Sequence, residues 1–276
     1  MTQDILNNIY ANIISTILCA IPGVILLFTT VIINRQRTLR FFGISRQKPA
    51  LRIYVSRLEI KPSGTIGIEP IEIGYSGSAI NQVEFQGALL IRDALRSKWL
   101  SLLPSRLQDW LGQQSVTLMT VDPPIEVSPQ VEADVSYDNL VVLGSSIYSL
   151  VSKIYLEHPS CMFQFVKNAS GERTLRMRDG GLKDVELPGR SKDQELGVIQ
   201  RIKDHNHGTV VYICAGLGAS ATYGSIRYLI KNWVHLQRKY KDADFGICLA
   251  FKDQPRDSSI VVQPRVIYES LSHNPS

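Results

Sequence analysis

The chain has little cysteine and no repetition. Four cysteines stand among 276 residues, and none forms a Cys-x-x-Cys pair, so a disulfide-stapled miniprotein is excluded and no zinc-ligand spacing is present. There is no internal repeat and no low-complexity segment, and 44% of the residues are hydrophobic, which excludes a disordered or fibrous chain. Cys161, Cys214 and Cys248 lie in or beside apolar runs and are predicted to be buried free thiols. No metal and no cofactor is expected.

Charge is missing from the N-terminal part. No residue from Ile5 to Asn34 is charged, and 9–33 reads IYANIISTILCAIPGVILLFTTVII. At about 1.5 Å per residue, a helix of this length exceeds the hydrocarbon core of roughly 30 Å. A secretory signal peptide would have a basic start, whereas here the only preceding charge is Asp4. The N-terminal segment 1–34 is therefore predicted to hold a single transmembrane helix at about 9–33.

Acidic residues are missing from the next segment. It carries seven cations: Arg35, Arg37, Arg40, Arg46, Lys48, Arg52 and Arg57. Because Lys and Arg flanking a span stay on the cytoplasmic side, we expect the N-terminus outside the cell membrane and the C-terminal part in the cytoplasm. Residues 35–50 would form a basic juxtamembrane linker, with Phe41 and Phe42 resting at headgroup depth; recognition of an anionic lipid is an alternative reading of the charge.

The total charge of +5 belongs to that segment. The residues after Arg57 hold 23 Lys and Arg against 24 Asp and Glu. A nucleic-acid duplex is therefore not expected as a partner.

Short apolar runs alternate with amphipathic stretches in 51–276. Helices are predicted at 78 to about 100, 147–156 and 221 to about 238, and a β-hairpin at 162–167 and 174–178. Buried strands are predicted at 51–60, 116–121, 139–143, 209–214 and 245–251. This alternation predicts an α/β domain: a Rossmann-like, mostly parallel sheet with helices on both faces and an inserted β-hairpin.

Two junctions between a strand and a helix share one design. In the junctions at 143–146 and 214–220, a buried strand is followed by Gly and small residues before a helix begins. The free N–H groups and the dipole at the start of such a helix attract an anion. A further candidate is the Tyr-Ser-Gly-Ser run at the start of the first predicted helix. The candidate ligand-binding residues are Gly144, Ser145, Ser146, Gly216, Leu217, Gly218, Ala219, Ser220, Thr222, Arg227, Ser76 and Ser78. The alternatives are that the glycines serve only packing, and that Arg227 is a solvated helix residue.

No catalytic constellation is evident. Glu84 and Asp179 could act as acid or base, but solvated surface carboxylates are the favoured interpretation of both. Residues 205–207 (His-Asn-His) are predicted to form a solvated turn rather than a metal site. Ser145 lacks the GxSxG context of a nucleophile elbow.

The strand, Gly loop and helix of 210–230 and the GSSIYSLV turn at 144–151 resemble nucleotide-sensing Rossmann-like modules of the SLOG and CARF/SAVED classes. These belong to bacterial conflict and second-messenger systems, so the resemblance implies a nucleotide-derived ligand. The SLOG Gly-Thr-x-x-Glu pattern does not follow the Gly loop, which argues against phosphoribohydrolase activity. The whole chain also resembles single-span bacterial, especially cyanobacterial, proteins.

These features suggest a membrane-anchored receptor for a nucleotide or nucleotide-derived second messenger. One span cannot form a pore, so signalling through it would require a homo-oligomer. The expected partners are the lipid bilayer, a small anionic ligand and further copies of the chain. The alternatives are a membrane-tethered enzyme acting on a nucleotide or sugar phosphate, and a membrane scaffold without ligand.

Overall fold

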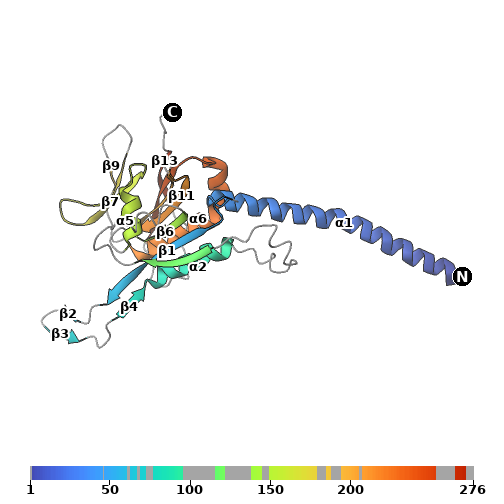
Figure 1. Cartoon of the computed structure of the whole chain (residues 1–276), viewed down its shortest axis with the longest axis horizontal. Helices are drawn as coiled ribbons and strands as arrows, with labels where there is room; N and C mark the ends of the chain where they lie inside the picture. Colours follow the sequence, from blue (N-terminus) through green and yellow to red (C-terminus); the bar gives the residue numbers. More distant parts are fainter. Residues whose placement is uncertain are drawn as a thin grey trace.

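One long helix projects from an α/β body in the computed structural model (Figure 1). The structure describes residues 2–45, 47–60, 63–66, 69–72, 77–95, 116–121, 138–144, 149–178, 185–187, 194–204, 207–252 and 265–271. The helices are α1 (Thr2–Phe41), α2 (Gln82–Leu95), α5 (Leu150–Glu157) and α6 (Ala219–Tyr240). The strands are β1 (Leu51–Ile60), β2 (Ser63–Ile66), β3 (Glu69–Glu72), β4 (Gly77–Ile80), β5 (Val116–Val121), β6 (Asn139–Leu143), β7 (Phe163–Lys167), β8 (Arg173–Met177), β9 (Val185–Glu186), β10 (Gln194–Asp204), β11 (Thr209–Gly216), β12 (Phe245–Lys252) and β13 (Arg265–Leu271).

The main sheet has the order β13-β12-β10-β11-β6-β1-β4, with β5 also paired to β1. β5, β1, β6 and β11 run parallel to their neighbours among these four. β12 points the same way, because β11 and β12 are both antiparallel to β10. The predicted mixed α/β fold with a mostly parallel sheet is confirmed at this level. β10 is a strand that the sequence patterns did not predict, and it separates β11 from β12.

Alternating side chains of the strands build two cores. On one face, Ile53, Val141 and Tyr212 pack with α2, α6 and the end of α1. On the other, Leu140 and Val211 pack with α5, β7 and β8. β7 and β8 pair antiparallel in a small sheet that β9 completes. Helices therefore cover both faces of the main sheet.

The start of α2 differs from the prediction. The segment expected to begin a helix at Ser78 is strand β4, in which Ser78 pairs with Glu59 of β1. The helix begins at Gln82, after Asn81, whose side-chain oxygen accepts a hydrogen bond from Val83 N at 3.1 Å. The cap and the strand pairing together move the helix start four residues along the chain.

The N-terminal helix is longer than predicted. Residues 18–41 are long and apolar enough to cross a membrane by length and composition, and apolar side chains such as Leu26 (71% exposed) face outward. α1 continues through 35–41, the first part of the expected linker.

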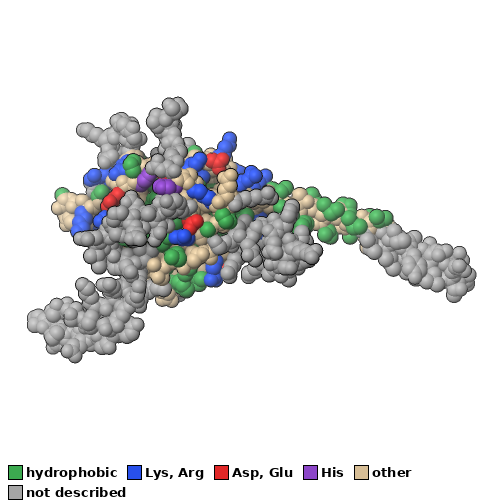
Figure 2. Space-filling model, in the orientation of Figure 1, with side chains coloured by type: hydrophobic (Ala, Val, Ile, Leu, Met, Phe, Trp, Pro, Cys, Tyr) green, Lys and Arg blue, Asp and Glu red, His purple; other side chains and the backbone are tan. Residues whose placement is uncertain are grey.

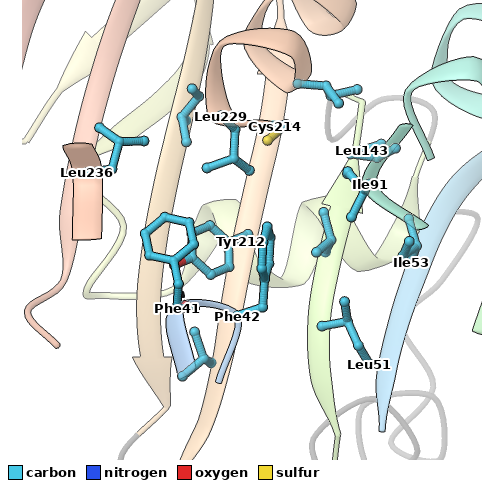
Figure 3. Packing of buried hydrophobic residues seen from close by; sticks show 14 of the residues in the cluster. Phe41, Phe42, Leu51, Ile53, Ile91, Leu143, Tyr212, Cys214, Leu229 and Leu236 are labelled. Atoms are coloured by element: carbon cyan, nitrogen blue, oxygen red, sulfur yellow. Dashed lines mark hydrogen bonds between the residues drawn. The ribbon is translucent and has the colours of Figure 1, made fainter. Parts of the chain in front are cut away.

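The prediction that Phe41 and Phe42 lie at headgroup depth is wrong. Their side chains are 2% and 0% exposed. The centroid of each ring lies 5.1 Å from the centroid of the Tyr212 ring (Figure 3). The Tyr212 hydroxyl donates to Phe41 O at 2.6 Å, and Asn139 Nδ2 donates to Gly43 O at 2.9 Å. The end of α1 is therefore part of the body's core, and the apolar rings are removed from water there rather than by lipid.

Candidate functional site

The two Gly junctions lie at the same edge of the sheet. β6 and β11 are parallel neighbours, with Leu143 paired to Cys214, so both strands end at one level. Gly144 N donates to Cys214 O at 3.0 Å, which binds the first junction to the second. Of the predicted site residues, Ser76, Ser145 and Ser146 lie outside the described residues, and Ser78 lies in β4 rather than at a helix start.

At this edge, the connections that follow β1 and β6 lie on opposite faces of the sheet. Residues 51–54 of β1 pair with β5 on one side and β6 on the other. The connection from β1 to β5 runs through α2 on one face, whereas the chain leaves β6 through α5 on the opposite face. Ligands of open α/β sheets bind at such switch points, beyond the carboxyl ends of the strands.

Glu84 lies at this switch point. The interpretation of Glu84 as a solvated surface carboxylate is wrong. It stands in the first turn of α2 and is 3% exposed. Ser56 N donates to its Oε2 at 2.8 Å, and Asn81 Nδ2 approaches Oε1 at 3.4 Å. Burial raises the pKa of Glu84, and the hydrogen bond from Ser56 N partly opposes that increase. Asp179 lies outside the described residues.

Gly144 packs directly on the Glu84 carboxyl group. Its φ is +91°, and a Cβ at this position would lie 2.3 Å from Glu84 Oε1 and 3.0 Å from Ser56 Oγ. Ser152 Oγ donates to Gly144 O at 3.0 Å, and Ser149 caps α5 by accepting from Ser152 N at 3.2 Å. Glycine is therefore required at this junction by both conformation and space.

At the second junction, Gly216 is tightly packed whereas the first residues of α6 are exposed. A Cβ on Gly216 would lie 2.6 Å from Thr222 N and from the Ala221 side chain, so strand and helix meet too closely for any other residue. Ala219 and Ser220, which begin α6, are exposed. The first turn of α6 thus presents backbone N–H groups at the sheet edge.

The other predicted residues in α6 and just before it make contacts within the body. Thr222 is buried, and its hydroxyl donates to Gly218 O at 3.1 Å. Arg227 lies about two turns along the helix, with its guanidinium carbon 5.9 Å from the centroid of the Tyr223 ring. Leu217 N donates to Leu196 O at 2.9 Å, which fixes the loop to β10.

Sequence reasoning missed Glu195. A Cβ on Gly218, the N-cap of α6, would lie 2.7 Å from both Glu195 carboxylate oxygens. A carboxylate here is stabilised by the same helix field that would attract a phosphate. The half-buried Glu195 carboxylate can accept hydrogen bonds from N–H or O–H donors of a ligand, whereas the backbone N–H groups of the first turn of α6 suit an anion. Glu195 belongs to the unpredicted strand β10, so no sequence pattern indicated its position.

The cysteines follow the prediction. Cys161, Cys214 and Cys248 are free and buried, and burial raises the pKa of Cys161 to about 11 and that of Cys248 to about 12. Of the 205–207 segment, His207 is described: it lies in a turn, with Nδ1 2.9 Å from Asp204 Oδ2. Within the described ranges, no group of three His, Cys, Asp or Glu side chains could hold a metal ion.

The chain matches no family model, no curated protein and no solved structure.

Proposed function

We propose that the chain is a single-pass membrane receptor whose body binds a nucleotide or nucleotide-derived second messenger at the carboxyl edge of β1, β6 and β11. The body lies in the cytoplasm and the N-terminus outside, in keeping with the cations of 35–57. Binding changes how the α1 helices of a homo-oligomer associate. No catalytic step is required for this function.

One observation carries the proposal: the strands that end at the Gly junctions also hold the end of α1. β6 begins at Asn139, which binds Gly43, and ends next to Gly144. β11 contains Tyr212, which binds Phe41, and ends at Gly216. A displacement at the ligand edge can therefore reach α1 through two hydrogen-bonded strands. A scaffold without ligand does not need this connection.

The edge suits the parts of a nucleotide. The first turn of α6 offers N–H groups to a phosphate, and Ala219 and Ser220 leave it accessible. The half-buried carboxylate of Glu195 can accept a hydrogen bond from a ribose hydroxyl or a base amino group. Glu195 opposes an anion beside Gly218, so we expect Glu195→Gln to tighten the binding of phosphate-bearing ligands.

The test is a thermal-shift screen of the full chain in detergent with mono-, di- and cyclic oligonucleotides. At roughly 100 times its Kd, a ligand adds about 2.7 kcal/mol of stability. Gly216 is unsuitable as a test position because its substitution disturbs packing. Ser220→Asp is sharper: an acidic residue in the first helical turn stabilises the helix by about 0.3–1 kcal/mol but repels a phosphate.

We expect Ser220→Asp to melt no lower than the native chain while losing the ligand shift, and Ser220→Ala to keep most of it. Absence of a shift across the panel would refute the nucleotide receptor. An equal shift in Ser220→Asp would place the ligand elsewhere.

Glu84 favours a second candidate, an enzyme acting on a nucleotide or sugar phosphate. A buried carboxyl with a raised pKa at a switch point is suited to general acid catalysis. Turnover of a bound ligand, lost in Glu84→Gln while binding persists, would favour the enzyme over the receptor.

A further inference from the structure

Two cationic segments about 200 residues apart in the sequence lie side by side. Gln237 Nε2, near the end of α6, donates to Arg37 O on α1 at 3.3 Å. In Figure 1 the last turns of α6 lie where α1 leaves the body. Lys and Arg side chains gather at this junction (Figure 2). The exposed cations are Arg37 and Arg40 on α1 and Arg238, Lys239 and Lys241 at the end of α6, with exposed Asp242 next to them.

The length of α1 places this surface close to the bilayer. The uncharged stretch ends at Asn34, and Leu39 is already buried in the body. Five helical residues rise about 7.5 Å, while each headgroup layer is about 5–7 Å thick. Because 35–41 is helical and α1 is hydrogen-bonded into the core, no flexible spacer separates the body from the membrane.

We propose that these five cations, here called the cationic collar, bind the anionic phospholipid headgroups of the leaflet beside the body. This proposal rests on the proposed membrane span but not on the nucleotide ligand. Arg and Lys donate charge-assisted hydrogen bonds to lipid phosphates. Each cation near an anionic surface contributes about a fivefold increase in affinity, and the effect falls off within a Debye length of about 8 Å.

Topology alone does not account for the collar. The excess of Lys and Arg that orients a membrane span is counted within about 15–20 residues of its ends. The α6 cations are far outside that range in the sequence. Dipoles favour cations at the end of each helix separately, but that preference does not require the two ends to share one exposed surface. The collar holds the body in one orientation against the bilayer.

The experiment measures the distance of the body from the headgroups. The full chain with Cys19→Ser and His235→Cys carries a donor dye at the exposed position 235, because the other cysteines are buried. It is reconstituted in nanodiscs of phosphatidylcholine, with or without phosphatidylglycerol, and a trace of headgroup-labelled acceptor lipid. Energy transfer reports how closely the collar approaches the surface.

We expect phosphatidylglycerol to increase the transfer and salt to reverse the increase. Lys239→Glu with Lys241→Glu should abolish the response. The matched reversal of Lys153 and Lys167, which lie on α5 and β7 across the sheet, should retain it. Equal melting temperatures would show that both variants are folded.

Transfer that is independent of phosphatidylglycerol, or an equal response from the two double variants, would refute the collar. Flotation with neutral vesicles tests the span separately. A chain that does not float would refute the span and, with it, the collar.

Discussion

Phe42→Ala should destabilise the body strongly if the end of α1 belongs to its core. The Phe42 side chain is 0% exposed and contacts the rings of Phe41 and Tyr212, with centroids 5.2 and 5.1 Å away. Truncating a fully buried phenylalanine costs about 3–5 kcal/mol, because the lost burial is joined by the cost of a cavity. We therefore expect the free energy of unfolding to fall by about that amount.

The assay is urea unfolding of the full chain in mild detergent, followed by tryptophan fluorescence. Trp233 is a suitable probe because its ring lies 6.3 Å from that of Phe41. The matched control is Phe28→Ala, the same truncation on the outward-facing part of α1, where Phe28 is 42% exposed. This control should leave the unfolding of the body unchanged. A loss below about 1 kcal/mol for Phe42→Ala, or equal losses for both, would refute the packed junction.

Three further predictions concern the site and the topology. Gly144→Ala should cost about 2–5 kcal/mol through left-handed strain and overpacking against Glu84; Gly171→Ala, at φ +79° with no atom within 4 Å, should cost only about 1–2 kcal/mol in the same unfolding assay. Because burial raises the pKa of Glu84 above its ordinary value of 4.5, the protonated form is favoured in the folded state. The stability should fall as pH rises from 4.5 through that raised pKa, and Glu84→Gln should remove this slope; parallel stability–pH curves would contradict it. Ala169→Cys, in an exposed turn, should react with an impermeant thiol reagent only after permeabilisation. Labelling in intact cells would contradict the predicted cytoplasmic position of the body.

Much of the fold follows from local pattern. The strands β1, β6, β11 and β12 are short apolar runs whose alternate side chains fill the two cores, so composition alone indicates them. Charge patterning and length indicate an apolar helix able to cross a membrane. The fate of the Phe41–Phe42 pair could not be predicted in this way, because an aromatic beside cations suits either a headgroup layer or a core. Tyr212, 170 residues away in the chain, decides between them.

The site could be predicted only in part. Gly144 and Gly216 are recognisable because Gly at the end of a buried strand indicates close packing or a ligand loop. Glu84 is recognisable as a possible acid or base, but its burial is not, since a carboxylate near a helix start is usually solvated. Glu195 lies in β10, which no sequence pattern indicates. Glu84 is buried where β1 pairs with β6, and the half-buried Glu195 is placed by the pairing of β10 with β11 and β12. The pairings of β1 with β6 and of β10 with β12 join residues that lie far apart in sequence.

The most direct test of the account is the association of α1 in response to ligand. Cys19 is exposed on α1, and Leu18→Cys and Ile21→Cys, each with Cys19→Ser, sample other faces of the same helix. We expect thiol cross-linking between chains at one or more of these positions to change when a ligand found by thermal shift is added. Tyr212→Phe removes the hydroxyl that binds Phe41 and should weaken that change while the ligand still binds. Cross-linking that is unaffected by a bound ligand at all three positions would contradict the proposed coupling.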